Sequence, residues 1–381
     1  MEIINVSQLR VLHTADLHLG RSFQSWGDAA QTRRQDLLDT LDEIGQIARQ
    51  QRVHLLLLAG DQFDQHNPDR AIASRFFSWL DALGQDGVRV AMISGNHDSY
   101  WYEDSVYRQA LPENTVFFSD TQCQEPVEIY ASGLNVSLYG IAHDHTRHRD
   151  VLPGFRRRGE SDVHIGLMHA TVDPRSDIEV AERYLPLSSA DLATTELDYL
   201  ALGHLHRART INEGGPGMAA YPGSPEPLHV GETGERSVTL ATFSGGPPQI
   251  STIPCGKRVA RREAVDATGL TDSEIAERIA TLADETVILT AELTGAPQEI
   301  VDTDPLARRL AHHFCYLTVT DRTSVVDSGY VRRIENEHTI RGEFVRRLRD
   351  RIAAAGDDRE RRVAELALQV GLIQLERRSA R

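Results

Sequence analysis

A run of mostly apolar residues, Val53–Ala59, constrains the fold of this 381-residue chain more than any other feature. Such a run is typical of a strand that is buried on both faces, as in a parallel sheet covered by helices. The flanking pattern predicts strands at Leu9–His13 and Val88–Ile93 and helices at Asp36–Gln50 and Arg70–Leu83. This β-α-β-α-β order predicts a layered α/β core.

Residues that can bind metals or transfer protons follow nearly every predicted strand. Four further strands are expected, near Val136–Tyr139, Val163–Met168, Tyr199–Leu202 and Ser237–Phe243. The residues in question are Asp16, His18, Asp61, Asn96, His97, His169, His204 and His206. Ligands of α/β sheets bind beyond the carboxyl ends of the strands. Core packing would not generate this recurrence of Asp, Asn and His, so the sequence predicts a site at one sheet edge.

The spacing of these residues suits a pair of metal ions. Positions 16 and 18, like 204 and 206, are two residues apart, so their side chains point to the same side of an extended chain. Asp61 follows Gly60, which permits a sharp turn, and its carboxylate can bridge two cations. Asn96 adds a neutral oxygen ligand. Mixed nitrogen and oxygen ligands suit Mn²⁺, Fe or Zn²⁺ better than Mg²⁺.

Each of these residues has an ordinary alternative, a capping aspartate or a hydrogen-bonded histidine, but the ordered set makes that alternative a poor one. The other histidines lack a matching pattern and are expected to be surface or packing residues: His54, His66, His143, His145, His148, His164 and His229.

The complete series of motifs resembles that of the calcineurin-like metallophosphoesterase superfamily. The motifs are Asp16-x-His18, Gly60-Asp61-x-x-Asp64, Gly95-Asn96-His97-Asp98, His169 and Gly203-His204-x-His206. The resemblance implies an α/β fold, a two-sheet α/β sandwich with the metals at the sheet edge. It implies one ion held by Asp16, His18, Asp61 and His206, and another held by Asp61, Asn96, His169 and His204. It also assigns His97 to protonation of the leaving oxygen, with Asp64 as the residue that orients it.

Residues around these motifs resemble the SbcD-type DNA repair exonucleases. The matching stretches are His13–Arg21, Gly60–Asp64 followed by Pro68, Met168–Thr171, Asp198–His206 and Tyr221–Pro225. Asp64 replaces the tyrosine ligand of purple acid phosphatases, and Gln65-His66 departs from the serine/threonine phosphatase pattern. The resemblance implies a DNA exonuclease or endonuclease that cuts phosphodiester bonds at DNA ends in double-strand break repair. It implies a cofactor of two divalent ions, for which Mn²⁺ is the leading candidate. It also implies a partner, an SMC-like coiled-coil ATPase, and it is compatible with a homodimer.

Two other functions stay open at this stage. The first is a nucleotide or small-molecule phosphodiesterase with the same dinuclear site. The second is a non-catalytic interaction scaffold, which the intact ligand set disfavours.

A change in composition at Ser244–Lys257, rich in glycine and proline, predicts a domain boundary. We expect a catalytic domain over residues 1–250, a small α/β DNA-capping domain over 257–330 and a helical segment over 331–381. That segment either packs back on its own domain or docks a partner protein. One face of the last helix is lined by Val363, Leu366, Ala367, Val370 and Ile373. Candidate phosphate contacts are Arg156–Arg158, Arg261, Arg262, Arg308 and Arg309.

Composition adds three expectations. The formal net charge of −15 does not indicate a nucleic-acid binder, although bound divalent ions would add positive charge at the site. The three cysteines are far apart and form no CxxC pair, so no disulfide framework is expected. The sequence begins without a signal-peptide pattern and lacks an apolar segment that could span a bilayer, so we expect a cytoplasmic protein.

Overall fold

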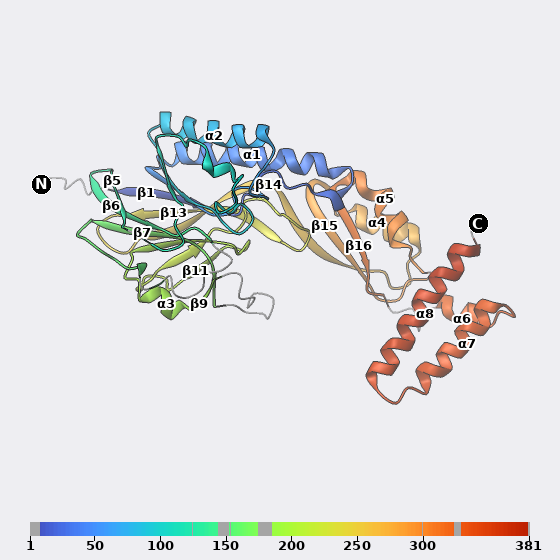
Figure 1. Cartoon of the computed structure of the whole chain (residues 1–381). Coiled ribbons are helices and arrows are strands. Elements are labelled where there is room, and N and C mark those ends of the chain that lie inside the picture. Colours follow the sequence, from blue (N-terminus) through green and yellow to red (C-terminus); the bar gives the residue numbers. More distant parts are fainter. Residues whose placement is uncertain are drawn as a thin grey trace, which may run out of the picture. The chain divides into compact units, whose positions relative to one another are not determined.

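The computed structural model describes residues 8–123, 125–143, 152, 154–173, 185–298, 300–323 and 329–379. The chain divides into two compact units, Met1–Val259 and Ala260–Arg381 (Figure 1). His145 and His148 lie outside the described residues. No described helix is both long enough and apolar enough to cross a membrane.

The first unit contains a mixed sheet built around the apolar run. Its order is β13 (Gly234–Phe243), β1 (Leu9–Thr14), β2 (Leu55–Ala59), β3 (Arg89–Ile93) and β4 (Thr115–Phe118). The strands from β1 to β4 are parallel, and β13 pairs antiparallel with β1. Helices α1 (Ala29–Gln50) and α2 (Arg70–Gln85) lie over one face of this sheet (Figure 1). Every residue of β2 is buried, as the apolar run predicts.

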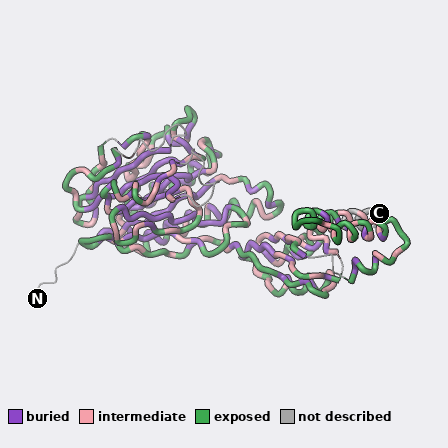
Figure 2. The backbone as a smooth tube through the Cα atoms, turned by 90° about the horizontal axis from the view of Figure 1, so that it is seen from below, coloured by how far each residue is buried: buried purple, intermediate pink, exposed green. Residues whose placement is uncertain are grey.

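A second sheet faces the first. Its order is β11 (Arg209–Ile211), β12 (Ala219–Tyr221), β10 (Tyr199–Gly203), β7 (Val163–His169), β6 (Leu134–Gly140) and β5 (Val127–Ala131). The short strands β8 (Thr171–Val172) and β9 (Pro186–Leu187) pair beside it, and the shorter helices here are η1 (Gln24–Trp26), η2 (Val106–Arg108) and α3 (Ser189–Ala193). Apolar side chains of both sheets, such as Val11, Leu57 and Ile165, form one core between them. Figure 2 shows the buried residues concentrated along these strands. The α/β two-sheet sandwich expected from the motifs is therefore confirmed.

Helix α1 begins earlier than its apolar pattern predicts, because its first turns bury charge instead of apolar side chains. The guanidinium of Arg33 is fully buried and donates to Asp36 (2.7 Å) and to Glu226 (2.8 Å). It also lies over the rings of Phe23 (5.4 Å) and Trp26 (5.7 Å). Apolar periodicity therefore does not predict the first turns of α1.

The second unit is a small α/β layer followed by helices. Strand β14 (Gln249–Asp266) runs through most of the glycine- and proline-rich segment, and the boundary between the units falls within this strand. In the second unit β14 is followed by α4 (Asp272–Ala280), β15 (Asp284–Thr294), α5 (Thr303–Leu310), η5 (Ala311–His313) and β16 (Phe314–Asp321). Thr271 and Glu274 form the capping box at the start of α4. The last helices, α6 (Gly329–Glu335), α7 (Ile340–Ala353) and α8 (Asp358–Ser379), share a separate small core.

The buried ion pair of Arg33 yields a stability prediction. Glu226→Ala leaves a buried guanidinium with one carboxylate fewer, so we expect the free energy of unfolding to fall by about 3 kcal/mol. The surface pair of Arg49 and Asp86 is the matched control, because it also involves α1 but is well exposed. Asp86→Ala should cost less than about 1 kcal/mol. Urea unfolding followed by tryptophan fluorescence would measure both variants, and equal losses would contradict the prediction.

Candidate metal centre

The residues predicted to bind metal lie together at one edge of the sandwich. Asp16 and His18 follow β1, Asp61 follows β2, and Asn96 and His97 follow β3 in the first sheet. His169 ends β7, and His204 and His206 follow β10 in the second sheet. The carboxyl ends of five strands from two sheets therefore supply one site, as is usual for ligand sites of α/β sheets.

Asp61 lies at the centre of this group. Its Oδ2 atom is 3.7 Å from His18 Nε2 and 3.4 Å from His169 Nε2. Its Oδ1 atom accepts a hydrogen bond of 2.9 Å from the backbone N–H of His97. One carboxylate oxygen thus lies between imidazoles that come from different sheets, where it could bridge two ions.

The remaining residues form a group on each side of Asp61. Asp16, His18 and His206 offer ligand atoms within 4.8 Å of one another. On the other side, Asn96 Oδ1 is 3.0 Å from His169 Nε2 and 3.2 Å from His204 Nδ1. The structure therefore brings all seven candidate ligands into two overlapping groups.

The hydrogen bonds of His18, His169 and His206 fit a metal site. His18 Nε2 is buried and has no hydrogen-bond partner among the described residues. His169 donates from Nδ1 to the carbonyl oxygen of Ala59 (2.9 Å), which leaves its Nε2 directed at Asp61 and Asn96. His206 donates from Nδ1 to Glu232 Oε1 (2.7 Å). A second partner that fixes the tautomer in this way is usual for metal-binding histidines.

The electrostatics of the group also favour positive charge. Burial alone would raise the pKa of Asp61, but His169 and His18 hold that pKa well below its usual range. Burial alone would lower the pKa of His169, but the carboxylates of Asp61 and Asp16 raise it to about 9. Burial and the neighbouring His169 lower the pKa of His204 to about 3. Asp61 is thus ionised beside a protonated His169, and a divalent ion would replace that proton.

The backbone of the site is strained. Asp16 (φ 55°), His18 (φ 45°), Asp61 (φ 52°) and His204 (φ 100°) have positive φ values, which side-chain-bearing residues rarely adopt. Each such residue costs on the order of 1–3 kcal/mol, and such strain concentrates at functional sites.

Glycines make this close packing feasible. A Cβ at Gly60 would overlap the ring of His169, and a Cβ at Gly95 would overlap the carboxylate of Asp61. A Cβ at Gly203 would overlap the carbonyl oxygen of Ala59. The glycines of the three motifs therefore allow the two sheets to approach each other closely, in addition to allowing the turns.

Asp64 differs from its expected role as the partner of His97. Its carboxylate accepts from His18 Nδ1 (3.0 Å) and from Arg21 (3.0 Å). His97 Nδ1 lies instead 3.3 Å from the backbone carbonyl oxygen of Asp64. The structure therefore directs the Asp64 carboxylate to a candidate metal ligand and leaves the orientation of His97 to the main chain.

Asp98, the last residue of the Gly95–Asp98 motif, connects the loops that follow β2 and β3. It accepts hydrogen bonds from the backbone N–H groups of Gly95 (2.7 Å) and Phe63 (3.1 Å) and from the hydroxyl of Tyr107. Burial and the nearby Asp61 raise its pKa to about 6. These hydrogen bonds join the loop that carries Asp61 to the loop that carries Asn96.

Sequence reasoning did not assign a role to the stretch Tyr221–Pro225 or to Glu232, which support the ligands of the second sheet. The hydroxyl of Tyr221 donates to the carbonyl oxygen of Ala170 (2.7 Å) and accepts from the N–H of Val172 (2.9 Å), directly after His169. The backbone N–H of Ser224 donates to the carbonyl oxygen of His206 (3.2 Å). No short spacing in the sequence links these residues to the site, because their contacts depend on the completed fold.

His143 is a packing residue, as expected, and several of the candidate arginines form ion pairs. His143, which was expected to be a surface or packing residue, is buried with its ring centroid 6.0 Å from that of His169. Of the candidate phosphate contacts, Arg157 pairs with Asp198 (3.0 Å), Arg262 with Glu292 (3.0 Å) and Arg309 with Asp272 (2.6 Å).

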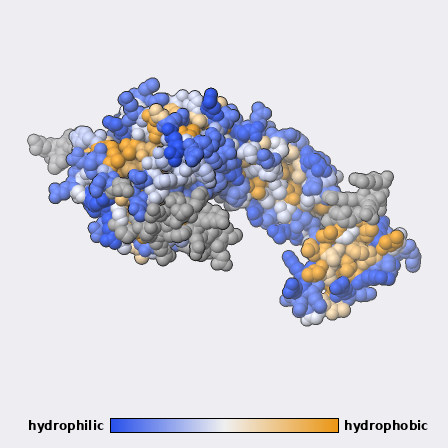
Figure 3. All heavy atoms as spheres, viewed as in Figure 1, coloured by the Kyte–Doolittle hydropathy of each residue, from blue (hydrophilic) through white to orange (hydrophobic). Residues whose placement is uncertain are grey.

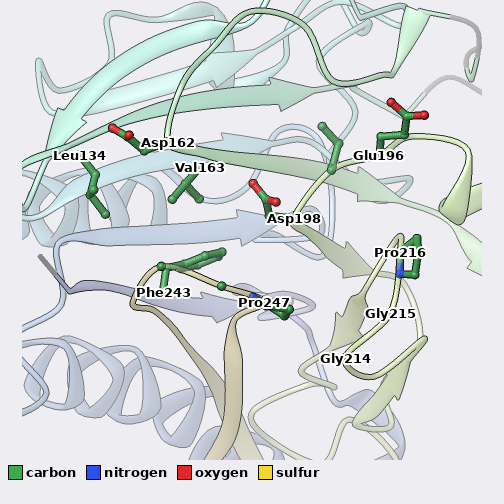
Figure 4. A pocket seen from close by; sticks show the side chains of 13 residues that line it. Leu134, Asp162, Val163, Glu196, Asp198, Gly214, Gly215, Pro216, Phe243 and Pro247 are labelled. Atoms are coloured by element: carbon green, nitrogen blue, oxygen red, sulfur yellow. The ribbon is translucent and has the colours of Figure 1, made fainter. Parts of the chain in front are cut away.

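A cavity of about 730 Å³ lies away from the metal ligands, where β7 and β10 begin (Figure 4). Two of its carboxylates, those of Asp162 and Asp198, accept hydrogen bonds next to strand ends. Asp162 accepts from the N–H of Asn135 (2.8 Å), and Asp198 accepts from the N–H of His164 (2.8 Å) as well as from Arg157. These hydrogen bonds account for Asp162 and Asp198 without a ligand.

Comparisons with known proteins identify the family of this chain. Residues 9–208, more than half of the chain, match the family of calcineurin-like phosphoesterases, so the chain belongs to that family. It is thus a metallophosphoesterase, as its motifs indicate.

Three curated relatives are each similar to about three fifths of the chain. The uncharacterized metallophosphoesterase YhaO of Bacillus subtilis is 28% identical over 63% of this chain and 59% of its own length. The SbcD component of the nuclease SbcCD of Bacillus subtilis is 29% identical over 62% of this chain and 67% of its own length. The DNA double-strand break repair protein Mre11 of Methanopyrus kandleri is 26% identical over 58% of this chain and 49% of its own length. The chain thus spans about half to two thirds of these relatives.

The position of Asp64 yields a prediction that separates its two roles. Because its carboxylate orients His18, Asp64→Ala should weaken Mn²⁺ binding by about 10- to 100-fold in calorimetric titration. Asp104→Ala is the control, because Asp104 is an exposed carboxylate that pairs with His66 in a neighbouring loop. If the Asp64 carboxylate served His97 instead, the variant would lose turnover and keep its Mn²⁺ affinity.

Proposed function

We propose that the chain is a cytoplasmic metal-dependent DNA exonuclease or endonuclease, which hydrolyses phosphodiester bonds at DNA ends during double-strand break repair. The observation that carries the proposal is the pair of ligand groups that share Asp61, in a chain similar to a component of a named nuclease and to a named break-repair protein. The stretch Tyr221–Pro225 adds support, because it braces the ligands His169 and His206 in this chain.

We assign the ligands to two ions as the motifs imply, and the short distances around Asp61 support this assignment. Asp16, His18, Asp61 and His206 would hold one ion, and Asp61, Asn96, His169 and His204 would hold the other. Two divalent ions there would activate water as the nucleophile and neutralise charge that develops on the phosphate. The mixed nitrogen and oxygen donor set suits Mn²⁺, Fe or Zn²⁺. Of these ions we propose Mn²⁺, which is the one that the resemblance of the motifs implies.

His97 is the proposed proton donor. Its side chain is exposed at the site, and its ring centroid is 4.7 Å from that of His18. Donation from Nδ1 to the carbonyl oxygen of Asp64 would leave Nε2 to deliver a proton to the leaving oxygen. The hydrogen bond from its backbone to Asp61 holds this residue next to the proposed bridging ligand.

The second unit is proposed to bind DNA and a partner. Its α/β layer would cap the substrate, with Arg261 and Arg308 as exposed basic groups. Helix α8 carries an apolar stripe of exposed side chains, Val363 (59%), Leu366 (59%) and Val370 (50%). Figure 3 shows apolar atoms gathered over the C-terminal helices. We assign this stripe to an SMC-like coiled-coil ATPase, since an apolar helix face suits docking against another helix.

A nucleotide or small-molecule phosphodiesterase is the second candidate. The net charge of −15 and the ion pairing of Arg262 and Arg309 favour it, because these arginines are engaged by carboxylates.

The nuclease proposal predicts Mn²⁺-dependent degradation of linear duplex DNA. His97→Ala should lower the rate by about 100-fold or more, because it removes the proton donor while the metal ligands stay in place. End-labelled duplexes incubated with Mn²⁺ would show the loss, and metal analysis should show unchanged Mn²⁺ content. His312→Ala, an exposed histidine of the second unit, is the control. Hydrolysis of a chromogenic diester without any cleavage of DNA would favour the second candidate.

The docking proposal predicts that Leu366→Asp abolishes binding of the ATPase partner, because the stripe would then bury an unpaired charge. Pull-down of the purified partner would measure binding, and circular dichroism would check that the helices remain folded. Arg361→Asp, an exposed position on another side of α8, should keep the interaction. Undiminished binding by Leu366→Asp would count against this surface.

A further inference from the structure

A second concave surface lies directly beside the metal centre. It is a cavity of about 720 Å³ whose wall includes His206, one of the candidate ligands. Its other lining residues include Arg207, Arg209, Arg236 and Glu232. Among the described residues, the lining thus includes three arginines and one carboxylate, in a chain whose net charge is −15.

The carboxylate of this cavity already accepts hydrogen bonds from other residues. Glu232 accepts from His206 Nδ1 (2.7 Å), from the N–H of Leu228 (2.8 Å) and from the hydroxyl of Ser224 (3.3 Å). Burial alone would raise the pKa of Glu232, but its hydrogen bond to His206 and the charge of that ring lower the pKa to about 2. Glu232 thus forms part of the cavity wall and accepts a hydrogen bond from the candidate metal ligand His206.

Two of the three arginines are also part of the wall. Arg236 is buried and donates to the carbonyl oxygens of His206 (2.7 Å) and Glu232. Arg209 donates to the carbonyl oxygen of Val172 (3.0 Å) and lies 3.6 Å from Asp173. Their positive charge still contributes to the field in the cavity, but their hydrogen bonds are largely satisfied.

Arg207 is different, because its side chain is exposed and forms no hydrogen bond or ion pair with a described residue. Its backbone is nonetheless fixed. A Cβ at Gly223 would come within 2.9 Å of His206 O and Ala208 N, which shows how closely the two loops pack. The hydrogen bond from Ser224 to His206 adds a further restraint. A guanidinium with free donors on a fixed backbone is well suited to phosphate, whose oxygens it can bind in pairs.

We propose that this cavity is a subsite for a phosphate group that flanks the phosphodiester being cleaved, with Arg207 as its recognition residue. The inference rests on the proposed action on DNA, and it adds how the site selects its substrate. A strand with a phosphate on either side of the scissile group gains a charged contact that an isolated diester lacks. Arg207 is thus a specificity-determining residue outside the metal ligands.

Dinucleotides that differ by one phosphate test the subsite. The probes are TpT, pTpT and TpTp, each measured as a competitor of bis(p-nitrophenyl) phosphate hydrolysis by the Mn²⁺-loaded full chain. With the wild type, one phosphorylated form should compete about tenfold better than TpT, which is the value of one charge-assisted hydrogen bond. With Arg207→Gln, this preference should shrink to within about twofold.

Arg89→Gln is the matched control, because Arg89 is an exposed arginine at the start of β3, the end of the strand remote from the metal ligands. It should keep the wild-type preference. A wild type without any preference, or a preference that survives Arg207→Gln, would overturn the subsite. A wild type that shows the preference but degrades no DNA would contradict the nuclease proposal and leave the subsite standing.

Discussion

The contact between the carboxyl ends of the two sheets is the interaction on which the rest of the site depends. His169, at the end of β7, donates to the carbonyl oxygen of Ala59, at the end of β2 (2.9 Å). The backbone N–H of His204, after β10, lies 3.1 Å from both carboxylate oxygens of Asp16, after β1. These cross-sheet hydrogen bonds need backbones that approach closely, and only glycine fits at the tightest points. The first sheet supplies all three candidate oxygen ligands and one imidazole, and the second supplies three imidazoles, so neither sheet alone could complete the site.

Burial at this junction determines the protonation of the ligands. In a low-dielectric environment neighbouring charges act strongly, so two imidazoles from adjacent strands shift in opposite directions. The pKa of His169 rises to about 9 because carboxylates face it, whereas burial and the charge of His169 lower the pKa of His204 to about 3. Hydrogen bonds behind the ligands then decide which nitrogen faces the centre. Asp64 performs this task for His18, the carbonyl oxygen of Ala59 for His169, and Glu232 for His206.

The sequence was sufficient to predict the α/β class, the residues that meet at the edge and the strands β1, β2, β3, β6, β7, β10 and β13. Apolar runs and the short motifs at strand ends carry that information. The shorter strands β4, β5, β8, β9, β11 and β12 were not predicted. It was insufficient where a contact joins distant segments. The partner of the Asp64 carboxylate is such a case, since the choice between His18 and His97 depends on how the loops pack. The first turns of α1 are another, because the buried Arg33 lacks the apolar signal on which helix prediction depends. Glu232 combines both difficulties, as a polar residue outside any motif whose partner lies elsewhere in the chain.

The acidic composition of the chain and its proposed action on DNA are compatible for a physical reason. Screening limits the reach of exposed carboxylates to about a Debye length, roughly 8 Å at physiological ionic strength. What a phosphate meets at the site is therefore set by local groups, here the divalent ions and the guanidiniums beside His206. The bound ions would define the reaction, because they would act on the phosphate that is cut. Selection among phosphoesters must come from groups that contact the rest of the substrate. Arg207 lines the cavity beside the candidate ligand His206 and forms no hydrogen bond or ion pair with a described residue.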